Sequence, residues 1–343
     1  NILNLLGISN FTNLQQLNCS NNQLTSLDVS ACIDLAALYC SFNQLNSLNI
    51  TNCINLSYLN CIQNQLTTLD ASSCFSLNYL ECGGNDLTSL NVLGLSALTL
   101  LTCTSNNLST IDVSTCTSLQ ILNCGYNQLT SLDVTQNTSL TYLFLYENQL
   151  TSLDVSQNTA LDFLECSYNQ LIILDVSQNI ALKSLDCNYN QLTSLDVTQN
   201  VALENIYCNS NQLTSLDVTQ NVALNTLYCV DNQLTNLDVS QNLNLVMLSC
   251  ASNQLTSLDV TQNSRLTNLY CGGNQLTSLF IKNNNQYWID LVFDENPNLE
   301  YVCANENDLA IVQQKINDYG YTNCHVNSYC SFVPNGTFYT IQG

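Results

Sequence analysis

The chain of 343 residues contains 26 Asp and Glu against only four Lys and Arg, which gives a formal net charge of −22, and 45% of its residues are hydrophobic. Such an acidic balance argues against DNA, RNA and anionic lipid as partners, because these ligands require clustered cations. No run of about 18 apolar residues occurs, so we expect no helix inserted in a membrane.

The N-terminal segment "NILNLLGIS" aligns with residues 22–30, and Asn1 holds the place of a recurring Asn. We therefore expect a fragment that begins inside a repeat array without its N-terminal cap. No signal peptide is visible, but a chain that begins within a repeat would lack one in any case.

The body of the chain repeats one 21-residue unit, L-x-x-L-x-C-x-x-N-Q-L-T-S-L-D-V-x-x-N-x-x, as in residues 203–223. An Asn recurs every 21 residues from Asn22 to Asn274. Within each unit, segments such as "LENIYC" and "LTSLDV" alternate apolar and polar residues, which indicates strands with one buried face. This pattern predicts one elongated solenoid, in which equivalent strands of successive turns pair in parallel.

The cysteines also follow the repeat: most of the 19 are 21 residues apart, from Cys19 to Cys271, and Leu145 fills the same slot once. A slot that accepts Leu requires an apolar group. Stacked neighbours would lie about 4.8 Å apart, farther than the Cβ atoms of a disulfide, and no C-x-x-C or His pairing indicates zinc. We therefore predict buried thiols. The Asn ladder and a second, mixed Cys and Asn ladder are interpreted as structural.

The segment "LxxLxCxxNxL" resembles the consensus of leucine-rich repeats, with Cys in the last Leu position. The companion "LTSLDVTQNxxL" makes the unit resemble the 21-residue bacterial class called IRREKO. The resemblance covers residues 1–282, and it implies a leucine-rich repeat solenoid with a parallel sheet on the concave face and a second short-strand parallel sheet opposite. The tail from Asn305 resembles the end of such arrays in secreted, multi-module proteins of flavobacteria, which implies secretion or surface display with ligand binding along the curved sheet.

For the C-terminal part, the sequence predicts an irregular last repeat and a small helical cap over residues 283–331. The start of a linker or next module is expected at 332–343. Apolar residues recur at helical spacing from Asp308 to Tyr319, and a helix there would cover the open sheet edge. One disulfide is expected among three cysteines. We favour Cys303–Cys324, which would tie the two ends of the helix together, with Cys324–Cys330 as the alternative.

Catalysis finds little support, since the single His325 has no evident partners and no catalytic motif occurs. A column of carboxylates runs from Asp28 to Asp259. Carboxylates in such a column repel one another unless each accepts hydrogen bonds from nearby Ser, Thr or backbone donors, and we interpret the column as structural or solvating. Calcium binding is a minor alternative there. We expect no enzyme activity, no catalytic metal and no cofactor.

Function should lie at the positions that the repeat leaves variable. Early turns direct Tyr39, Phe42, Tyr58, Tyr79 and Glu81 outward from the first strand, two bland turns follow, and aromatic residues then crowd the surface. The second strand has almost none, although β-propensity acts on both strands alike, and exposed aromatic clusters mark interfaces. The predicted ligand-binding residues are Tyr126, Tyr142, Phe144, Tyr146, Glu147, Phe163, Glu165, Tyr168, Asp186, Tyr189, Tyr207 and Tyr228.

The leading hypothesis is thus a non-enzymatic binding or adhesion module of an extracellular or surface bacterial protein, monomeric, that docks a protein or a glycan. The alternative is a rigid spacer with no ligand of its own. A third possibility, ice binding by the Ser and Thr columns, is disfavoured by the Asp in each column.

Overall fold

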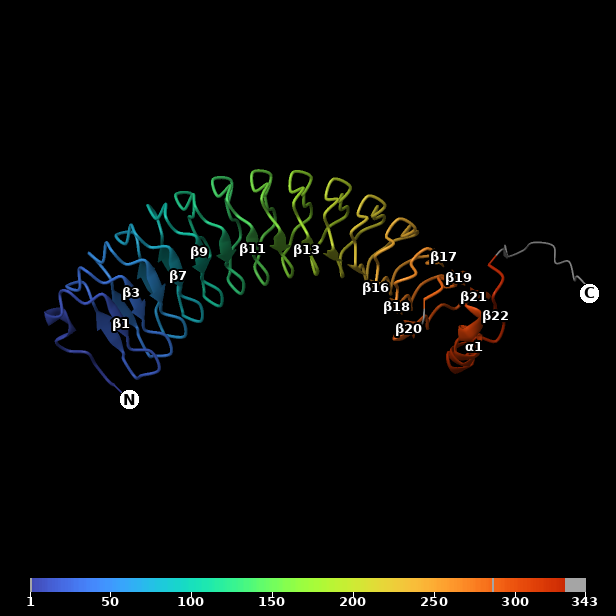
Figure 1. The fold of residues 1–343 in the computed structure, drawn as a ribbon, viewed down its shortest axis with the longest axis horizontal. Helices are drawn as coiled ribbons and strands as arrows, with labels where there is room; N and C mark the ends of the chain where they lie inside the picture. The colour runs from blue at the N-terminus through green and yellow to red at the C-terminus, as the bar shows by residue number, and fades with distance from the viewer. Residues whose placement is uncertain (1, 286, 331–343) are drawn as a thin grey trace, which may run out of the picture. The chain divides into compact units, whose positions relative to one another are not determined.

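The computed structural model describes residues 2–285 and 287–330 and divides into two compact units, Asn1–Leu182 (unit 1) and Lys183–Gly343 (unit 2). Each unit is a parallel β-solenoid whose turns follow the 21-residue repeat, as the sequence predicts (Figure 1). The described residues contain no helix long and apolar enough to cross a bilayer.

In unit 1, the first strand of every turn joins one parallel sheet in strict register, with Leu17 opposite Leu38 and Leu122 opposite Leu143. Figure 1 shows these strands on the inner side of the bend that unit 1 makes. A single-turn 3-10 helix (Ile8–Asn10) precedes them. In chain order the strands are β1 (Gln16–Asn18), β3 (Ala37–Tyr39), β5 (Tyr58–Asn60), β7 (Tyr79–Glu81), β9 (Leu100–Thr102), β10 (Ile121–Asn123), β11 (Tyr142–Phe144) and β12 (Phe163–Glu165).

The second segment of each turn forms a less complete sheet than the sequence predicts. In unit 1 only two pairs of strands hydrogen-bond there, β2 (Ser26–Asp28) with β4 (Ser47–Asn49), and β6 (Thr68–Asp70) with β8 (Ser89–Asn91). From residue 110 to 176 the equivalent segments are not assigned as strand. The inner sheet fixes the strand spacing at about 4.8 Å, and segments on the outer side of a bend must lie farther apart, which breaks the ladder.

Unit 2 continues the same construction and adds the C-terminal cap. Its first-strand sheet consists of β13 (Ser184–Asp186), β14 (Asn205–Tyr207), β15 (Thr226–Tyr228), β16 (Met247–Ser249), β18 (Asn268–Tyr270) and β20 (Asp290–Val292). Its second sheet consists of β17 (Ser257–Asp259), β19 (Ser278–Phe280), β21 (Tyr301–Cys303) and β22 (His325–Asn327). The irregular stretch before the cap is therefore one further turn, in which Phe293 is buried and Asn296 accepts a hydrogen bond from the Leu276 amide.

The core consists of columns of Leu, Val and Cys side chains with almost no exposed area. The thiols from Cys19 to Cys271 lie outside any disulfide and are buried, which confirms the prediction, and Leu145 is buried in their slot. Burial disfavours the thiolate, so it raises the pKa of Cys61 and of Cys250 to about 12. These cysteines pack as small apolar groups.

The phased Asn residues join each turn to the preceding one. The Asn127 amide nitrogen donates to the carbonyls of Cys103 (3.1 Å), Cys124 (3.0 Å) and Gly125 (3.2 Å), and its oxygen accepts from the Leu108 amide (3.0 Å). The partners are backbone groups of the same and the preceding turn, as expected for a structural ladder. Buried backbone groups need hydrogen-bond partners, and the Asn side chains supply them in this conformation of the turn. The ladder therefore stabilises that conformation.

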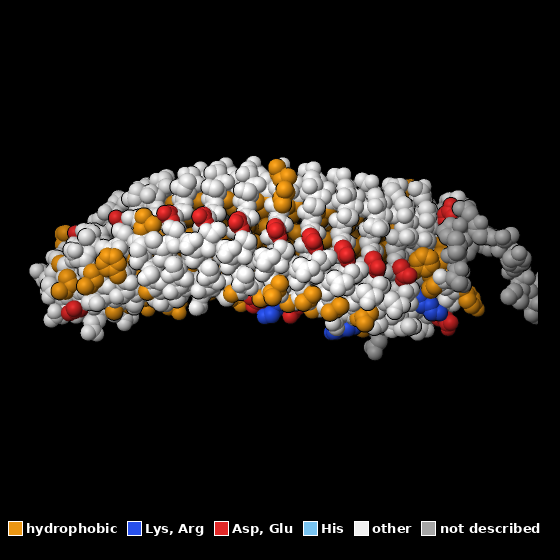
Figure 2. Space-filling view, turned by 90° about the horizontal axis from the view of Figure 1, so that it is seen from above, with side chains coloured by type: hydrophobic (Ala, Val, Ile, Leu, Met, Phe, Trp, Pro, Cys, Tyr) orange, Lys and Arg blue, Asp and Glu red, His pale blue; other side chains and the backbone are white. Residues whose placement is uncertain are grey.

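The column of carboxylates lies along the second segments, where Figure 2 shows it in red. Each carboxylate closes its own turn: Asp28 accepts from the Ser30 amide (3.0 Å) and hydroxyl (2.7 Å), and Asp133 accepts from the Thr135 amide (2.9 Å) and hydroxyl (2.7 Å). The Ser30 hydroxyl, followed by the backbone amide, lowers the pKa of Asp28 below its usual value. The donors that the sequence analysis required are thus present.

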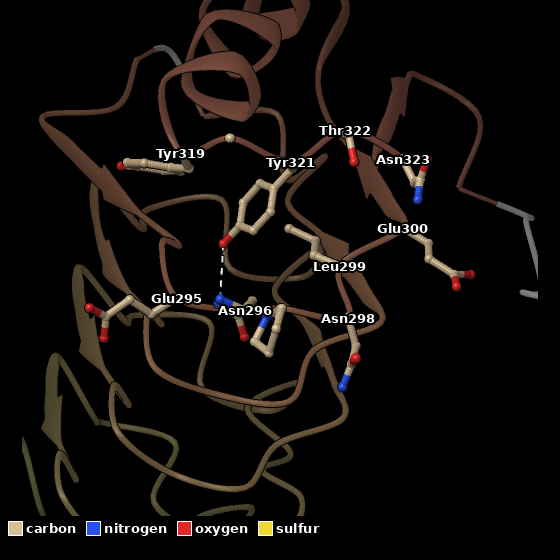
Figure 3. Close-up of a pocket in the computed structure, with 11 residues that line it drawn as sticks. Glu295, Asn296, Asn298, Leu299, Glu300, Tyr319, Tyr321, Thr322 and Asn323 are labelled. Atoms are coloured by element: carbon tan, nitrogen blue, oxygen red, sulfur yellow. Dashed lines mark hydrogen bonds between the residues drawn. The ribbon is translucent and has the colours of Figure 1, made fainter.

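The C-terminal helix α1 (Leu309–Asp318) forms where the sequence predicts it, after a 3-10 turn (Glu306–Asp308). It buries Val312 and Ile316. Beyond the helix, the Tyr319 ring lies edge-on to Phe293, with centroids 5.2 Å apart. The Tyr321 hydroxyl donates to the Phe293 carbonyl (2.6 Å) and accepts from the Asn296 amide (3.0 Å), which fixes the cap to the last turn (Figure 3).

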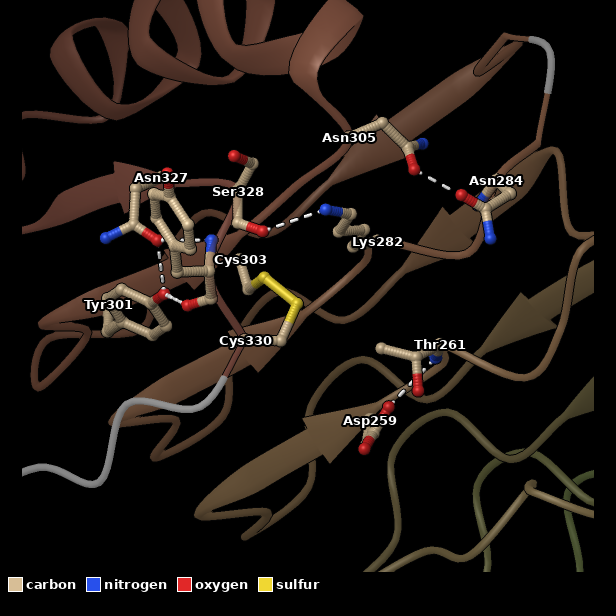
Figure 4. Close-up of a disulfide and its surroundings, with 11 residues drawn as sticks. Asp259, Thr261, Lys282, Asn284, Tyr301, Cys303, Asn305, Asn327, Ser328 and Cys330 are labelled. Atoms are coloured by element: carbon tan, nitrogen blue, oxygen red, sulfur yellow. Dashed lines mark hydrogen bonds between the residues drawn. A yellow bond between two sulfur atoms is a disulfide. The ribbon is translucent and has the colours of Figure 1, made fainter.

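The predicted Cys303–Cys324 disulfide is wrong, and so is the alternative, because the structure pairs Cys303 with Cys330 at a Cα–Cα distance of 5.3 Å (Figure 4). The register excludes Cys324: strand β22 lies parallel to β21 with His325 opposite Tyr301, so Cys324 is level with Glu300, about 10 Å of strand away from Cys303. Cys330 lies beyond the end of β22 at Asn327, where the chain leaves the strand and the Tyr329 carbonyl contacts the Tyr301 hydroxyl, which brings Cys330 beside β21. Cys324 stays a buried thiol.

Candidate functional site

In unit 1, the predicted binding residues lie on the first strands β11 and β12 and in the turns that directly follow β10, β11 and β12. We call Tyr126, Tyr142, Phe144, Tyr146, Phe163 and Tyr168, with Glu147 and Glu165, the unit-1 aromatic surface; all are exposed or half-buried. The Phe163 ring lies 5.0 Å from Phe144 and 6.4 Å from Tyr142, centroid to centroid. Tyr126 and Tyr146 form an edge-to-face pair at 5.1 Å. Such contacts favour fixed ring orientations.

The Tyr146 ring packs against Gly125 of the preceding turn. A Cβ at Gly125 would lie 2.4 Å from the Tyr146 ring carbon Cζ. The Tyr146 hydroxyl lies 3.5 Å from the Thr104 hydroxyl. Gly125 therefore leaves a space that the half-buried ring fills, and we call this space the cradle of Tyr146. Its only signal in the sequence is a glycine one turn before an aromatic residue.

Three of the tyrosines occupy a backbone conformation that bulky residues seldom adopt. Tyr126, Tyr168 and Tyr189 have φ of 51°, 52° and 52°. Left-handed backbone suits glycine, and the same position of the repeat is Gly84 and Gly273 in two turns, both with φ of 64°. Most other turns carry a further non-glycine residue there, such as Ser105 or Ser210, so the conformation belongs to the repeat and not to the tyrosines. A non-glycine residue there costs about 1–3 kcal/mol. This strain was not visible in the sequence.

In unit 2, the remaining predicted residues form a smaller group, the unit-2 aromatic surface, consisting of Asp186, Tyr189, Tyr207 and Tyr228. Tyr207 and Tyr228 make an edge-to-face pair with centroids 5.4 Å apart, and the Tyr228 hydroxyl contacts the Met247 sulfur. Tyr189 is 47% exposed. Burial raises the pKa of the Asp186 carboxyl and of the Tyr207 hydroxyl above their ordinary values.

The ionisable groups outside the aromatic surfaces form no metal-binding cluster in the part of the chain that the structure describes. The described residues contain no cluster of three or more His, Cys, Asp or Glu side chains placed to hold a metal ion. His325 is exposed on β22. The carboxylates of Asp28 and Asp133 are engaged within their own turns, as described above, so the calcium alternative gains no support from their geometry.

A cavity of about 500 Å³ lies in unit 2, lined by residues of the last turn and the cap, including Glu295, Glu300 and Tyr319 (Figure 3). Its lining is polar and open, and Tyr321 reaches across it to hold the cap in place. None of the predicted binding residues lines it.

The solved structures of other proteins place the chain in a family. The functional domain of InlJ from Listeria monocytogenes, which includes a cysteine ladder, is 34% identical, with a TM-score of 0.79 over 94% of this chain and 70% of that one. An internalin (inlF) from Listeria monocytogenes is 24% identical, with a TM-score of 0.69 over 78% of this chain and 83% of that one. The plant peptide hormone receptor RGFR1 in complex with RGF2 is 19% identical, with a TM-score of 0.63 over 89% and 61%.

The latter two show the fold alone. Neither a scan against protein-family models nor a search of curated proteins gives a match. The identity to the InlJ domain is high enough, and its extent long enough, to show kinship, and that domain, like this chain, includes a cysteine ladder. The chain belongs to the leucine-rich repeat proteins, in the group that includes the cysteine-ladder domain of InlJ.

Proposed function

We propose that this chain is a non-enzymatic binding module of a bacterial surface or secreted protein, and that the unit-1 aromatic surface docks a protein ligand. The observation that carries the proposal is the cluster of exposed and half-buried aromatic rings in consecutive turns. Phe163 lies 5.0 Å from Phe144, centroid to centroid, and Tyr126 forms an edge-to-face pair with Tyr146. Exposed aromatic clusters mark interfaces.

The contrast between the two faces of the same turns supports the proposal. The second segments of residues 127–182 present mostly Ser, Thr and Asp outward, apart from Ile172 and Ile173, whereas the first strands present aromatic rings. Because these second segments are not assigned as strand, the contrast supports the proposal through the exposure of the rings and not through strand preference. Half-exposed tyrosines with fixed orientations contribute much of the energy at protein interfaces.

RGFR1, a receptor of the same fold, was solved in complex with RGF2, which is a precedent for a protein ligand on this fold. Glu147 and Glu165 at the edge of the unit-1 aromatic surface suit a ligand with basic residues. A glycan stacked on Tyr146 is the second candidate, and its supporting observation is the ring's fixed position against Gly125.

Several finer assignments belong to the same proposal. We infer membership of the 21-residue IRREKO class from the repeat length, and kinship with flavobacterial multi-module proteins from the tail. We also infer a monomer that is displayed outside the cell. The domain limits proposed are 1–282 for the array and 283–331 for the last repeat and cap, whereas the segment 332–343, expected to start a linker, lies outside the described residues.

The test is a ligand screen with the purified chain on arrays of extracellular proteins and glycans. The variant Tyr146→Ala/Phe163→Ala/Tyr168→Ala should lose the ligand that the wild type retains. A control variant with Gln128, Gln149 and Gln170 changed to Ala alters exposed residues of the same turns and should retain it. If the aromatic variant bound as well as the wild type, the proposal would fail, and a chain that retains no ligand would favour the rigid spacer.

A further inference from the structure

A second group of aromatic residues lies on the first-strand sheet of unit 1, in turns that the predicted binding surface does not include. Tyr39, Tyr58 and Tyr79 come from the consecutive strands β3, β5 and β7. The Tyr58 ring lies 4.9 Å from Tyr39 and 6.0 Å from Tyr79, centroid to centroid. Tyr79 is 44% exposed, and the other two are half-buried. Together they form a continuous row of rings.

A carboxylate is held at the end of this row. Glu81 stands on β7 opposite Asn60 of β5. One of its oxygens, Oε2, accepts from the Tyr58 hydroxyl (2.7 Å) and from the Asn60 amide (2.7 Å). Two charge-assisted hydrogen bonds fix the carboxylate against the rings, so its orientation is set before any ligand arrives.

The charge around this group points to the ligand. Residues 1–182 contain no Lys, Arg or His, so no basic side chain of the same unit can neutralise Glu81. Aromatic faces attract cations through the ring quadrupole, and a carboxylate beside them adds direct attraction. Anions and carboxylate-rich partners are repelled for the same reason.

We propose that Tyr39, Tyr58, Tyr79 and Glu81 form a receptor for one cationic side chain, Arg or Lys, of a basic protein ligand. The cation lies over the exposed Tyr79 ring and faces the Glu81 carboxylate, while Tyr58 and Asn60 hold that carboxylate in place. We call these four residues the tyrosine–glutamate site. It does not depend on the unit-1 aromatic surface, which begins two turns later.

The experiment measures binding of a fluorescein-labelled hexa-arginine peptide to the full chain by fluorescence anisotropy at physiological salt, where long-range attraction is screened. Glu81→Gln keeps the hydrogen-bonding shape and removes the charge; we expect affinity at least fivefold weaker. Tyr79→Ala should weaken binding at least threefold. The matched control is Asp86→Gln, which removes one charge from the same turn and restores the Gln that other repeats have there; it should stay within twofold of wild type.

Equal losses for Glu81→Gln and Asp86→Gln would mean non-specific attraction to an acidic protein and would overturn the proposal, as would a wild type that binds no peptide. The Tyr146→Ala/Phe163→Ala/Tyr168→Ala variant separates the two surfaces. It should bind hexa-arginine within twofold of wild type. If it lost the peptide while Glu81→Gln kept it, the cation would belong to the unit-1 aromatic surface, and the tyrosine–glutamate site would be refuted.

Discussion

The cradle beneath Tyr146 offers the sharpest perturbation of the unit-1 aromatic surface, because it moves a ring without removing it. In Gly125→Ala the new Cβ would lie 2.4 Å from Tyr146 Cζ, whereas ordinary contacts begin near 3.4 Å. The ring must therefore retreat by about 1 Å or more, since a clash of this depth outweighs any contact energy. In doing so it gives up the edge-to-face contact with Tyr126 and the approach to Thr104.

The cost to folding should be small. The lost ring contact is worth about 0.5–1.5 kcal/mol, and Gly→Ala at an ordinary backbone conformation returns about 0.4–1 kcal/mol through the unfolded chain. We expect the free energy of unfolding, from urea titration followed by circular dichroism, to change by less than about 1 kcal/mol. Affinity for the ligand that the screen identifies should fall at least about tenfold, or about 1.4 kcal/mol.

Gly83→Ala is the matched control, since Gly83 holds the same position two turns earlier. Its Cβ would meet Thr104 at 3.1 Å and no aromatic ring. Binding should stay within twofold of wild type. If Gly125→Ala bound the ligand as tightly as Gly83→Ala, the orientation of Tyr146 would be irrelevant and the reasoning would be refuted.

Three further predictions concern the scaffold. Asn127→Ala should lower the free energy of unfolding by about 3 kcal/mol, because it leaves the buried Leu108 amide and several carbonyls without partners; a loss below 1 kcal/mol in urea melts would contradict the ladder's role. Ser210→Gly, at a position with φ of 51°, should raise the free energy of unfolding by about 1 kcal/mol. A decrease in the free energy of unfolding would show that the turn is unstrained. Burial raises the pKa of the Cys250 thiol to about 12, so its contribution to the free energy of unfolding is complete below about pH 9, where unfolded thiols stay protonated. As the pH rises from 9 toward 12, the free energy of unfolding should fall by up to about 1.4 kcal/mol per pH unit for each such thiol. A free energy of unfolding that does not fall across that window would refute this prediction.

The repeat made most of the fold predictable. A period of two in each segment and an unbroken 21-residue phase determine which side chains are buried, so the column from Cys19 to Cys271 and the ladder including Asn127 could be assigned before any coordinates. Helix α1 was predictable for the same reason, since its apolar spacing is regular. What failed depended on register across a loop: the pairing of Cys303 requires knowledge of where β22 lies against β21.

The candidate surface was only partly predictable. Alternation shows that Tyr146 and Phe163 point outward, but not that Tyr146 packs against Gly125, because side-chain direction depends on the neighbouring turn. The left-handed backbone at Tyr126 is likewise set by the hydrogen bonds of the adjacent Asn and not by local preference. The second sheet was overpredicted, since a pattern of two strands per turn does not reveal how far successive turns spread on the outer side of the coil.

The most direct test of the central claim is to map which tyrosines the bound ligand protects from nitration by tetranitromethane, with modified peptides quantified by mass spectrometry. Tyr126 and Tyr168 are 53% and 46% exposed and should be shielded in the complex, whereas Tyr287 and Tyr329, at 59% and 78%, should react as in the unbound chain. Unchanged nitration of Tyr126 and Tyr168 at saturating ligand, or protection confined to Tyr287 and Tyr329, would contradict the account.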